Sequence, residues 1–386
     1  MLTKVLKVLT SLRLTVVCLA LATVLVFIGT LAQVDEGLYQ AQTRYFKSFW
    51  IARPLNLPIG YPGGYLIGIV LMVNLLGAHA SRFKLTRKKA GLFMIHIGVI
   101  LLLVGQLLTD VLSRESSMHL TQGETKSYSE SFRDNELALI DTSDPQGDSV
   151  ISIPERKLAE RKEIHVPQTP FTVRVKNYWP NSMLSTNPGP IAVKADANKG
   201  LCTEADIYVF PLPQTTAMDQ RSLPSAVVEI STPQGAIGSW LVSPHINEPQ
   251  SFSAGGKTYN LAFRFARHYL FAGQNEPFRI HLLKFDHDLY RGTEVAKNYS
   301  SRIRLQNPAT GEDREVLIKM NSPLRYKGET FYQASFDQRD PSATVLEVVH
   351  NPSWLTPYLS CLLVGAGLLV QFLSHLFGFI KKRRLA

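Results

Sequence analysis

The sequence is poor in cysteine, with three among 386 residues and no CxxC pair. Cys18 and Cys361 fall inside long apolar runs, so Cys202 stands alone in the polar part of the chain. A lone cysteine cannot close an internal disulfide, and both zinc sites and dithiol exchange need further ligands or a second thiol. Any thiol chemistry connected with this chain therefore belongs to a partner.

Catalytic signatures are absent as well. The sequence contains no nucleophile elbow, no glycine loop that would cradle phosphate, and no carboxylate pair that stands out for acid–base catalysis. Hydrolase and kinase functions therefore have no support. Tryptophan is also scarce, and its four residues are scattered along the chain at Trp50, Trp179, Trp240 and Trp354.

Acidic residues are missing from three short basic segments, residues 4–13, 82–89 and 381–384. These segments hold 12 of the 41 basic residues, which leaves 29 against 31 acidic residues in the rest of the chain. The formal charge of +10 is therefore concentrated locally. Such charge is typical of the cytoplasmic flanks of membrane helices and does not indicate nucleic-acid binding. We expect all three segments, and with them both termini, in the cytoplasm.

Long apolar runs lie beside the basic segments, and we predict four transmembrane helices at residues 12–31, 61–78, 90–112 and 354–379. The length of each run is close to the number of helical residues, about 20, that crosses a hydrocarbon layer. An even number of spans agrees with two cytoplasmic termini. The first run also has the basic start of a cleaved signal peptide, but it is longer than a signal core of about 7–15 residues.

Three regions follow from these spans. Residues 1–112 form an N-terminal membrane region with three spans, and residues 354–386 form the fourth span with a basic cytoplasmic tail. Residues 113–353 have ordinary soluble composition and lie on the extracytoplasmic side. The predicted fold class is therefore a membrane protein with four transmembrane helices and a large extracytoplasmic domain between the third and fourth.

This large domain shows the alternation of apolar and polar residues that is typical of antiparallel strands with one buried face. Strands are expected at residues 171–179, 225–232, 259–265 and 278–285. A hairpin pairs residues 301–306 with 314–320, and Ile303, Leu305, Val316, Ile318 and Met320 are expected on its buried face. Residues 181–201 are predicted to be a long loop. We expect a β-rich, sandwich-like domain.

Histidine placement is the most informative chemical feature, because ligating groups inside spans are costly and usually functional. His96 lies seven residues after Lys89 in the third span, His79 lies three residues before Arg82, and His375 lies six residues before Lys381. All three are therefore expected near the cytoplasmic leaflet. Imidazole is a good axial ligand of haem iron, and the position of His96 inside its span makes it the strongest candidate. The alternative is a hydrogen bond to a neighbouring helix.

Seven further histidines lie in the large domain without metal-ligand spacing, at His119, His165, His245, His268, His281, His287 and His350. His287 is flanked by Asp286 and Asp288, which is more typical of a carboxylate-rich turn than of a metal site. Polar span residues Asn74 and Gln106 are expected to face other helices. The GxxxG spacing of Gly64 and Gly68 and the pair Gly365 and Gly367 would permit close helix packing.

Two motifs resemble the ResB family of the System II cytochrome c biogenesis machinery. The first is Ser11 to Thr15 leading into an apolar span, followed by Gly29, Thr30 and residues 32–45 (AQVDEGLYQAQTRY). The second is residues 321–335 (NSPLRYKGETFYQAS). The arrangement of four spans, with a soluble domain between the third and the fourth, also resembles that of this family.

The resemblance implies a subunit of a cytochrome c synthetase that exports haem and joins it to the CxxCH thiols of apocytochrome c. The implied cofactor is haem b, held as transported substrate and shared with a ResC/CcsA-type polytopic partner that bears a tryptophan-rich haem motif. His96 corresponds to the haem ligand of the third span, with His375 and His79 as weaker candidates. Because this sequence has no tryptophan-rich segment, we expect the chain to be one subunit of a haem lyase and not to be catalytic by itself.

Further implied partners are apocytochrome c and a thioredoxin-like thiol reductant. The implied location is the bacterial cytoplasmic (inner) membrane with a periplasmic domain, and a thylakoid membrane is the alternative. A competing function is a structural or sensory membrane protein whose outward β-domain binds a peptide or envelope ligand without haem.

Overall fold

A computed structural model describes residues 7–56, 58–82, 86, 89–145, 147–215, 220–271, 276–289, 296–336 and 340–385. The chain divides into two compact units. The helical unit is built from residues up to Arg114 and from Asn351 onward, and the β unit from Glu115 to His350. Most of the expected cytoplasmic loop, including Lys84, Arg87 and Lys88, lies outside the described residues, as does Lys4.

Four helices in the described part of the chain are long and apolar enough to cross a membrane. They are α2 (Leu12–Glu36), α4 (Gly64–Arg82), α5 (Ala90–Leu112) and α7 (Thr356–Leu385). Together with the β-rich region between α5 and α7, they confirm the predicted arrangement of four long apolar helices with a large β-rich domain between the third and the fourth. The second helix begins three residues later than expected, because Tyr61–Pro62 (β2) pairs instead with Trp50–Ile51 (β1).

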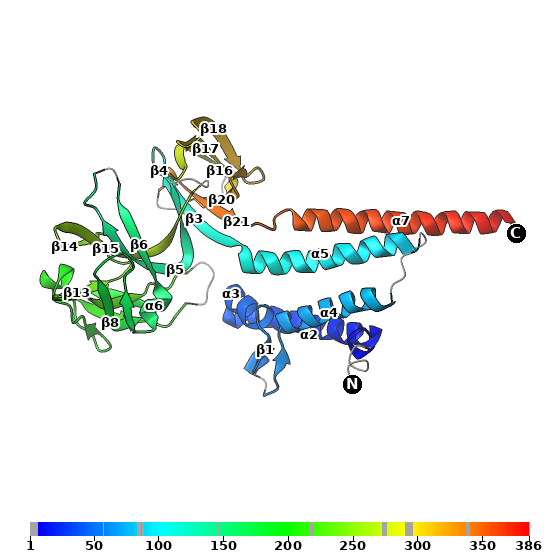
Figure 1. Cartoon of the computed structure of the whole chain (residues 1–386), viewed down its shortest axis with the longest axis horizontal. Coiled ribbons are helices and arrows are strands. Elements are labelled where there is room, and N and C mark those ends of the chain that lie inside the picture. Colours follow the sequence, from blue (N-terminus) through cyan, green and yellow to red (C-terminus); the bar gives the residue numbers. More distant parts are fainter. Residues whose placement is uncertain are drawn as a thin grey trace. The chain divides into compact units, whose positions relative to one another are not determined.

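Helices α5 and α7 lie side by side (Figure 1), and small residues at heptad spacing make this contact possible. Gly91, Gly98 and Gly105 are the buried residues of α5. A Cβ on Gly91 would lie 2.6 Å from both Gln371 N and Gly367 O, which are backbone atoms. The helices therefore touch backbone to backbone, as small residues permit in membrane bundles.

The predicted glycine faces were partly wrong. A Cβ on Gly68 or on Gly365 would meet no atom within 4 Å, so neither residue mediates helix packing. Gly64 lies instead against the backbone of Phe46, with a Cβ position 2.4 Å from Phe46 O. A glycine pair at i and i+4 occurs in many spans. The spacing alone does not indicate which segment of the chain packs against those glycines.

The segment after α2 is compact and polar. It contains a short α3 (Leu38–Ala41), a π-helical turn η1 (Gln42–Phe46) and a 3₁₀ turn η2 (Pro54–Asn56). Arg44 Nη1 lies 2.5 Å from Glu36 Oε1, and the fully buried Tyr45 donates its hydroxyl to the same oxygen over 3.3 Å. The first ResB-like motif therefore encodes the turn that closes this end of α2.

The β unit is organised around one long sheet with the strand order β14-β15-β5-β3-β21-β20-β19, where β6 also pairs with β5. Its strands are β3 (Arg114–Thr121), β5 (Tyr128–Asp141), β6 (Ser149–Pro154), β14 (Gln250–Ala254), β15 (Lys257–Tyr269), β19 (Leu324–Tyr326), β20 (Glu329–Phe336) and β21 (Ala343–His350). Every pairing described in this sheet is antiparallel.

Two four-stranded sheets accompany the long one, in the orders β13-β12-β8-β7 and β18-β17-β16-β4. The first comprises β7 (Glu163–His165), β8 (Thr172–Trp179), β12 (Ser225–Thr232) and β13 (Gly235–Val242). The second comprises β4 (Thr125–Lys126), β16 (Arg279–Leu289), β17 (Ala296–Asn307) and β18 (Glu312–Lys319). A short helix, α6 (Glu155–Ala159), follows β6.

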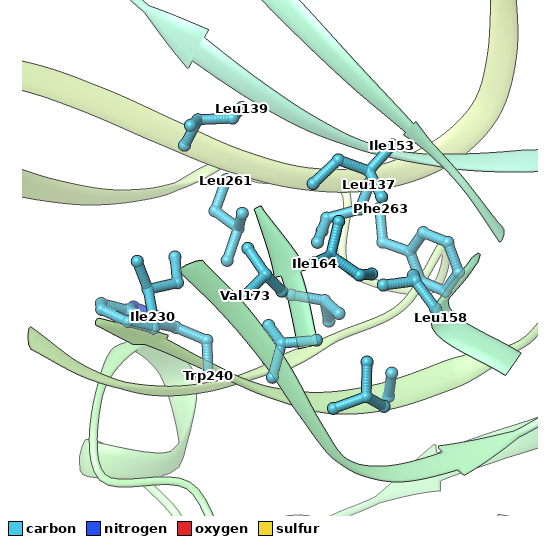
Figure 2. Close-up of a cluster of buried hydrophobic side chains, with 14 of the residues drawn as sticks. Leu137, Leu139, Ile153, Leu158, Ile164, Val173, Ile230, Trp240, Leu261 and Phe263 are labelled. Carbon is cyan, nitrogen blue, oxygen red and sulfur yellow. The ribbon is translucent and has the colours of Figure 1, made fainter. Parts of the chain in front are cut away.

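Each small sheet packs on a different half of the long sheet, so the unit has two hydrophobic cores. In the first core, Leu137 and Leu261 of the long sheet meet Val173, Ile230 and Trp240 of the facing sheet (Figure 2). The second core joins Met118 and Phe331 to Ile280, Ile303 and Ile318. The sandwich-like prediction is confirmed, but one continuous sheet serves two sandwiches.

The strand predictions are confirmed, but the prediction that Met320 lies on the buried face of the hairpin was wrong. The four predicted strands correspond to β8, β12, β15 and β16, and the predicted hairpin is β17 paired with β18. Ile303, Leu305 and Ile318 are fully buried, whereas Met320 is 46% exposed because β18 ends at Lys319. In the second ResB-like motif, Lys327 and Gly328 both have positive φ (49° and 86°), which suits the tight hairpin turn between β19 and β20.

The prediction of a long loop over residues 181–201 was wrong in part. Those residues contain β9 (Ser182–Ser185) and β10 (Val193–Lys194), which form a three-stranded sheet with β11 (Tyr208–Pro211), and η4 (Gly200–Thr203) begins at their end. Buried Ala195 and Val209 pack with Val227 and Leu241 in a small core of their own. These strands are too short to show a periodic pattern in the sequence.

The glycine contact gives a test of the helical unit. We expect Gly91→Ala to destabilise the unit by about 1–3 kcal/mol, because the added methyl meets backbone atoms that cannot rotate away. Gly365→Ala is the matched control and should be neutral, since its methyl enters open space. Thermal unfolding of both variants in detergent measures the difference, and equal midpoints would contradict the packing.

An exposed ion pair gives a test of the β unit. Lys257 Nζ lies 2.7 Å from Asp141 Oδ2, and this hydrogen bond, aided by Ser143, lowers the pKa of Asp141 from its usual 3.8 to about 2. The charged carboxylate therefore stabilises the fold above about pH 4, and this contribution is lost as the pH falls toward 2. At neutral pH the denaturation midpoint of the wild type should be higher than that of Asp141→Asn. In acid the two midpoints should converge. Asp206→Asn is the control, because the Asp206 side chain is 59% exposed whereas that of Asp141 is 19% exposed, and it should change little at either pH.

Candidate functional site

The structure brings His79 of α4 and His96 of α5 into contact. His96 Nδ1 and His79 Nε2 are 3.0 Å apart, and the two rings meet edge to face with centroids separated by 4.7 Å. The two residues lie 17 positions apart in the sequence. They meet because the last turns of α4 lie beside the first turns of α5.

With both imidazoles neutral, the hydrogen bonds of this pair fit one order of tautomers. His79 Nδ1 lies 3.0 Å from Leu75 O, and a carbonyl oxygen can only accept, so the proton is on His79 Nδ1. Nε2 of His79 is then an acceptor, and His96 Nδ1 donates to it. The lone pair of His96 is consequently on Nε2. A histidine binds a metal through Nε2 when its proton is on Nδ1, and this is the tautomer that His96 has here.

Both histidines line a cavity of about 460 Å³ among α2, α4 and α5. The lining residues recur at helical spacing, as one face of each helix requires. On α5 they are His96, Val99 and Leu103, and on α4 they include Leu71, Leu75, Ala78 and His79. Leu12, Thr15 and Leu19 come from α2. The wall is therefore apolar except for two imidazoles, two threonines and one asparagine.

Asn74 holds the α2 side of the cavity in place. The side chain is 3% exposed and accepts a hydrogen bond from Thr15 Oγ1 over 2.6 Å. Its amide nitrogen donates to Leu9 O at 2.6 Å and to Ser11 O at 3.0 Å, just before α2 begins. The prediction that Asn74 faces a neighbouring helix is confirmed. Gln106, in contrast, is exposed.

His375 does not line this cavity. It lies on α7, which packs against the glycine face of α5, whereas His96 is on the opposite side of α5. His375 Nε2 contacts Gln371 Nε2 at 2.8 Å, and Gln371 Oε1 accepts from the Leu92 backbone. The three candidate histidines therefore share one end of the helical unit, but the structure joins two of them.

No group of three or more metal-ligating side chains occurs among the described residues. Asp286 pairs with Lys284 at 2.6 Å, and His287 stacks on Phe285 and Phe336. The side chain of Asp288 lies outside the described residues. The histidine pair in the helical unit is therefore the strongest ligating group that the structure shows.

The sequence placed both residues near the basic loop between their helices but did not reveal their contact. Their similar distances from the basic loop were visible, since His79 precedes Arg82 by three residues and His96 follows Lys89 by seven. The rotation of each helix about its axis was not visible. The glycine heptad at 91, 98 and 105 was the available signal, because it assigns the opposite face of α5 to the packing contact with α7.

Comparison of the sequence with known proteins gives a match to a protein family and a match to a curated protein. Residues 235–349, from the start of β13 into β21, match the ResB-like family. The chain is also similar to Protein NrfI of Wolinella succinogenes, with 26% identity over 387 aligned positions that cover 93% of this chain and 35% of NrfI. The chain thus spans about a third of the length of this relative. The family match lies within the β unit, whereas the alignment with NrfI covers most of both units.

Proposed function

Starting from the resemblance to the ResB family, which both comparisons confirm, we propose that this chain serves cytochrome c biogenesis as a haem-handling membrane subunit. In this function it supports export of haem b and its attachment to the CxxCH thiols of apocytochrome c. The observation that carries the proposal is the hydrogen-bonded His79–His96 pair on the wall of an apolar cavity.

The residues present suit haem as a transported substrate. An imidazole that carries its proton on Nδ1 offers Nε2 to iron, and apolar walls suit the porphyrin. The cavity volume of about 460 Å³ falls within the range of about 300–1,000 Å³ that is usual for small-molecule sites. A second ligand to the iron would come from a ResC/CcsA-type partner.

Each residue then has a defined role. His96 would bind iron through Nε2, and His79 would hold the ring of His96 in the correct tautomer and orientation. Leu71, Val99 and Leu103 would exclude water from the metal face. Asn74 and Thr15 satisfy each other inside the helix contact and thereby keep α2 against α4. Haem supplies the iron and the vinyl groups that react with thiols, so this chain contributes binding and orientation.

The β unit is proposed to present apocytochrome c. The long sheet ends on β14 and β19, and an extended peptide can join such an edge through backbone hydrogen bonds. The thiols of apocytochrome c must be kept reduced. The described cysteines of this chain are unpaired, so a thioredoxin-like reductant is needed for this step. The proposed location is the bacterial inner membrane with both termini cytoplasmic and the β unit periplasmic, as the basic flanks favour.

The principal test replaces the proposed ligand. His96→Ala should lose most of the haem that co-purifies with the chain and its polytopic partner, and the yield of c-type cytochrome should fall in parallel. Added imidazole should partly restore both, because it can occupy the vacated position. His375→Ala removes a histidine at the same end of the unit and should retain wild-type absorbance in the Soret region. A colourless wild-type complex, or full haem loading in His96→Ala, would refute the function.

A second test separates positioning from ligation. His79→Leu removes the acceptor for His96 Nδ1 and should weaken haem binding by about 10–100-fold, as loss of a partner to a ligating histidine does. His79→Gln keeps an acceptor oxygen and should bind more tightly than His79→Leu. Haem titration followed by absorption measures both variants. Equal affinity of wild type and His79→Leu would show that His79 has no positioning role.

A further inference from the structure

Strands β5 and β15 interrupt their pairing at one place in the β unit. Phe265 pairs with Asn135, but the next pair along β15 joins Arg267 to Glu130. Residues 131–134 of β5 therefore stand opposite Ala266 alone. Such a bulge bends a strand and redirects side chains, and bulges are frequent beside functional sites. A cavity of about 480 Å³ opens there.

Acceptor groups dominate the polar lining of this cavity. Asp134, Asn135 and Glu136 come from β5, Glu155 and Arg156 from α6, and Tyr178 from β8. Glu136 is fully compensated, because Arg264 Nε lies 3.0 Å from Oε1 and Ser152 Oγ lies 2.6 Å from Oε2. Its negative charge is therefore not available to a ligand.

Glu155 is held differently. One carboxylate oxygen accepts from the Tyr178 hydroxyl, and the other accepts from Asn135 Nδ2 over 2.8 Å. Burial and the adjacent Glu155 raise the pKa of Tyr178, so the hydroxyl remains a neutral donor. Asp134 accepts from Ser131 Oγ at 3.1 Å. No cation among the described residues lies within ion-pair distance of Glu155 or Asp134, so two oriented carboxylates remain uncompensated.

A second, independent feature points to a missing donor. Asn135 lines the cavity with 3% of its surface exposed, and its Oδ1 accepts no hydrogen bond from the described residues. An unsatisfied buried acceptor costs about 1–3 kcal/mol. Since Nδ2 is bound to Glu155, the amide cannot rotate to relieve this cost. A ligand with several N–H donors would satisfy Asn135 and the carboxylates together.

We propose that this cavity binds a primary ammonium group, with Glu155 and Asp134 as its charge partners and Asn135 Oδ1 as a further acceptor. An ammonium group has three donors and no acceptor, which matches an acceptor-lined site. Arg156 also lines the cavity, but its side chain is exposed to solvent and forms no ion pair with Glu155. The group comes either from a lysine side chain of a bound polypeptide or from a free alkylamine.

This inference is independent of haem, because every residue in it belongs to the β unit. A capped glycine-rich peptide with one central lysine is the first probe, and the same peptide with norleucine is its uncharged match. Butylamine is the third probe. Saturation-transfer NMR with the purified full chain in detergent should detect the lysine peptide and not the norleucine peptide. Stronger binding of the lysine peptide than of butylamine identifies the polypeptide side chain as the source, and the reverse identifies a free amine.

Variants locate the binding to this cavity. Glu155→Gln keeps the size of the side chain but removes its charge, and it should weaken lysine-peptide binding about tenfold. Glu248→Gln makes the same change at an exposed position outside the cavity and should bind as wild type does. Asp134→Asn provides a second cavity variant if Glu155→Gln unfolds, as thermal melting would reveal. Equal binding of lysine and norleucine peptides, or unchanged affinity in a folded cavity variant, would overturn the proposal.

Discussion

The hydrogen bond between His79 and His96 is the interaction on which the candidate site depends. Polar groups among apolar helices are costly unless they satisfy one another, and here the chain from Leu75 O through His79 to His96 does so. The same bond determines which nitrogen of His96 keeps its lone pair. One contact thus satisfies polar groups inside the helical unit and prepares a ligand at the cavity wall.

Helix α5 can serve this site because its two faces have separate tasks. Its glycine face is closed by α7, where Ser360 Oγ also donates to Gly98 O over 2.6 Å. The opposite face, with His96, Val99 and Leu103, lines the cavity with α2 and α4. Tight packing on one side restricts the rotation of α5 about its axis, and this restriction keeps His96 directed toward His79.

The β unit follows a comparable principle on a larger scale. One sheet spans two cores, so its long strands must bend between them, and β5 and β15 change register between Phe265 and Arg267. At the irregularity, Asn135 of β5 lies in a cavity instead of a core and donates a hydrogen bond to Glu155 of α6. Regular pairing builds the hydrophobic cores, and the interruption creates a place where a ligand can be recognised.

Local patterns in the sequence determined the elements of this protein. Long apolar runs gave the four helices, and alternation gave strands such as β8, β12 and β17, because both signals arise from neighbouring residues that share one environment. The tertiary structure alone decided which side chains meet. His79 joined His96 and not His375, and Gly91 met α7 while Gly365 met nothing. These outcomes depend on helix rotation and on contacts between distant segments, and a periodic pattern does not encode either.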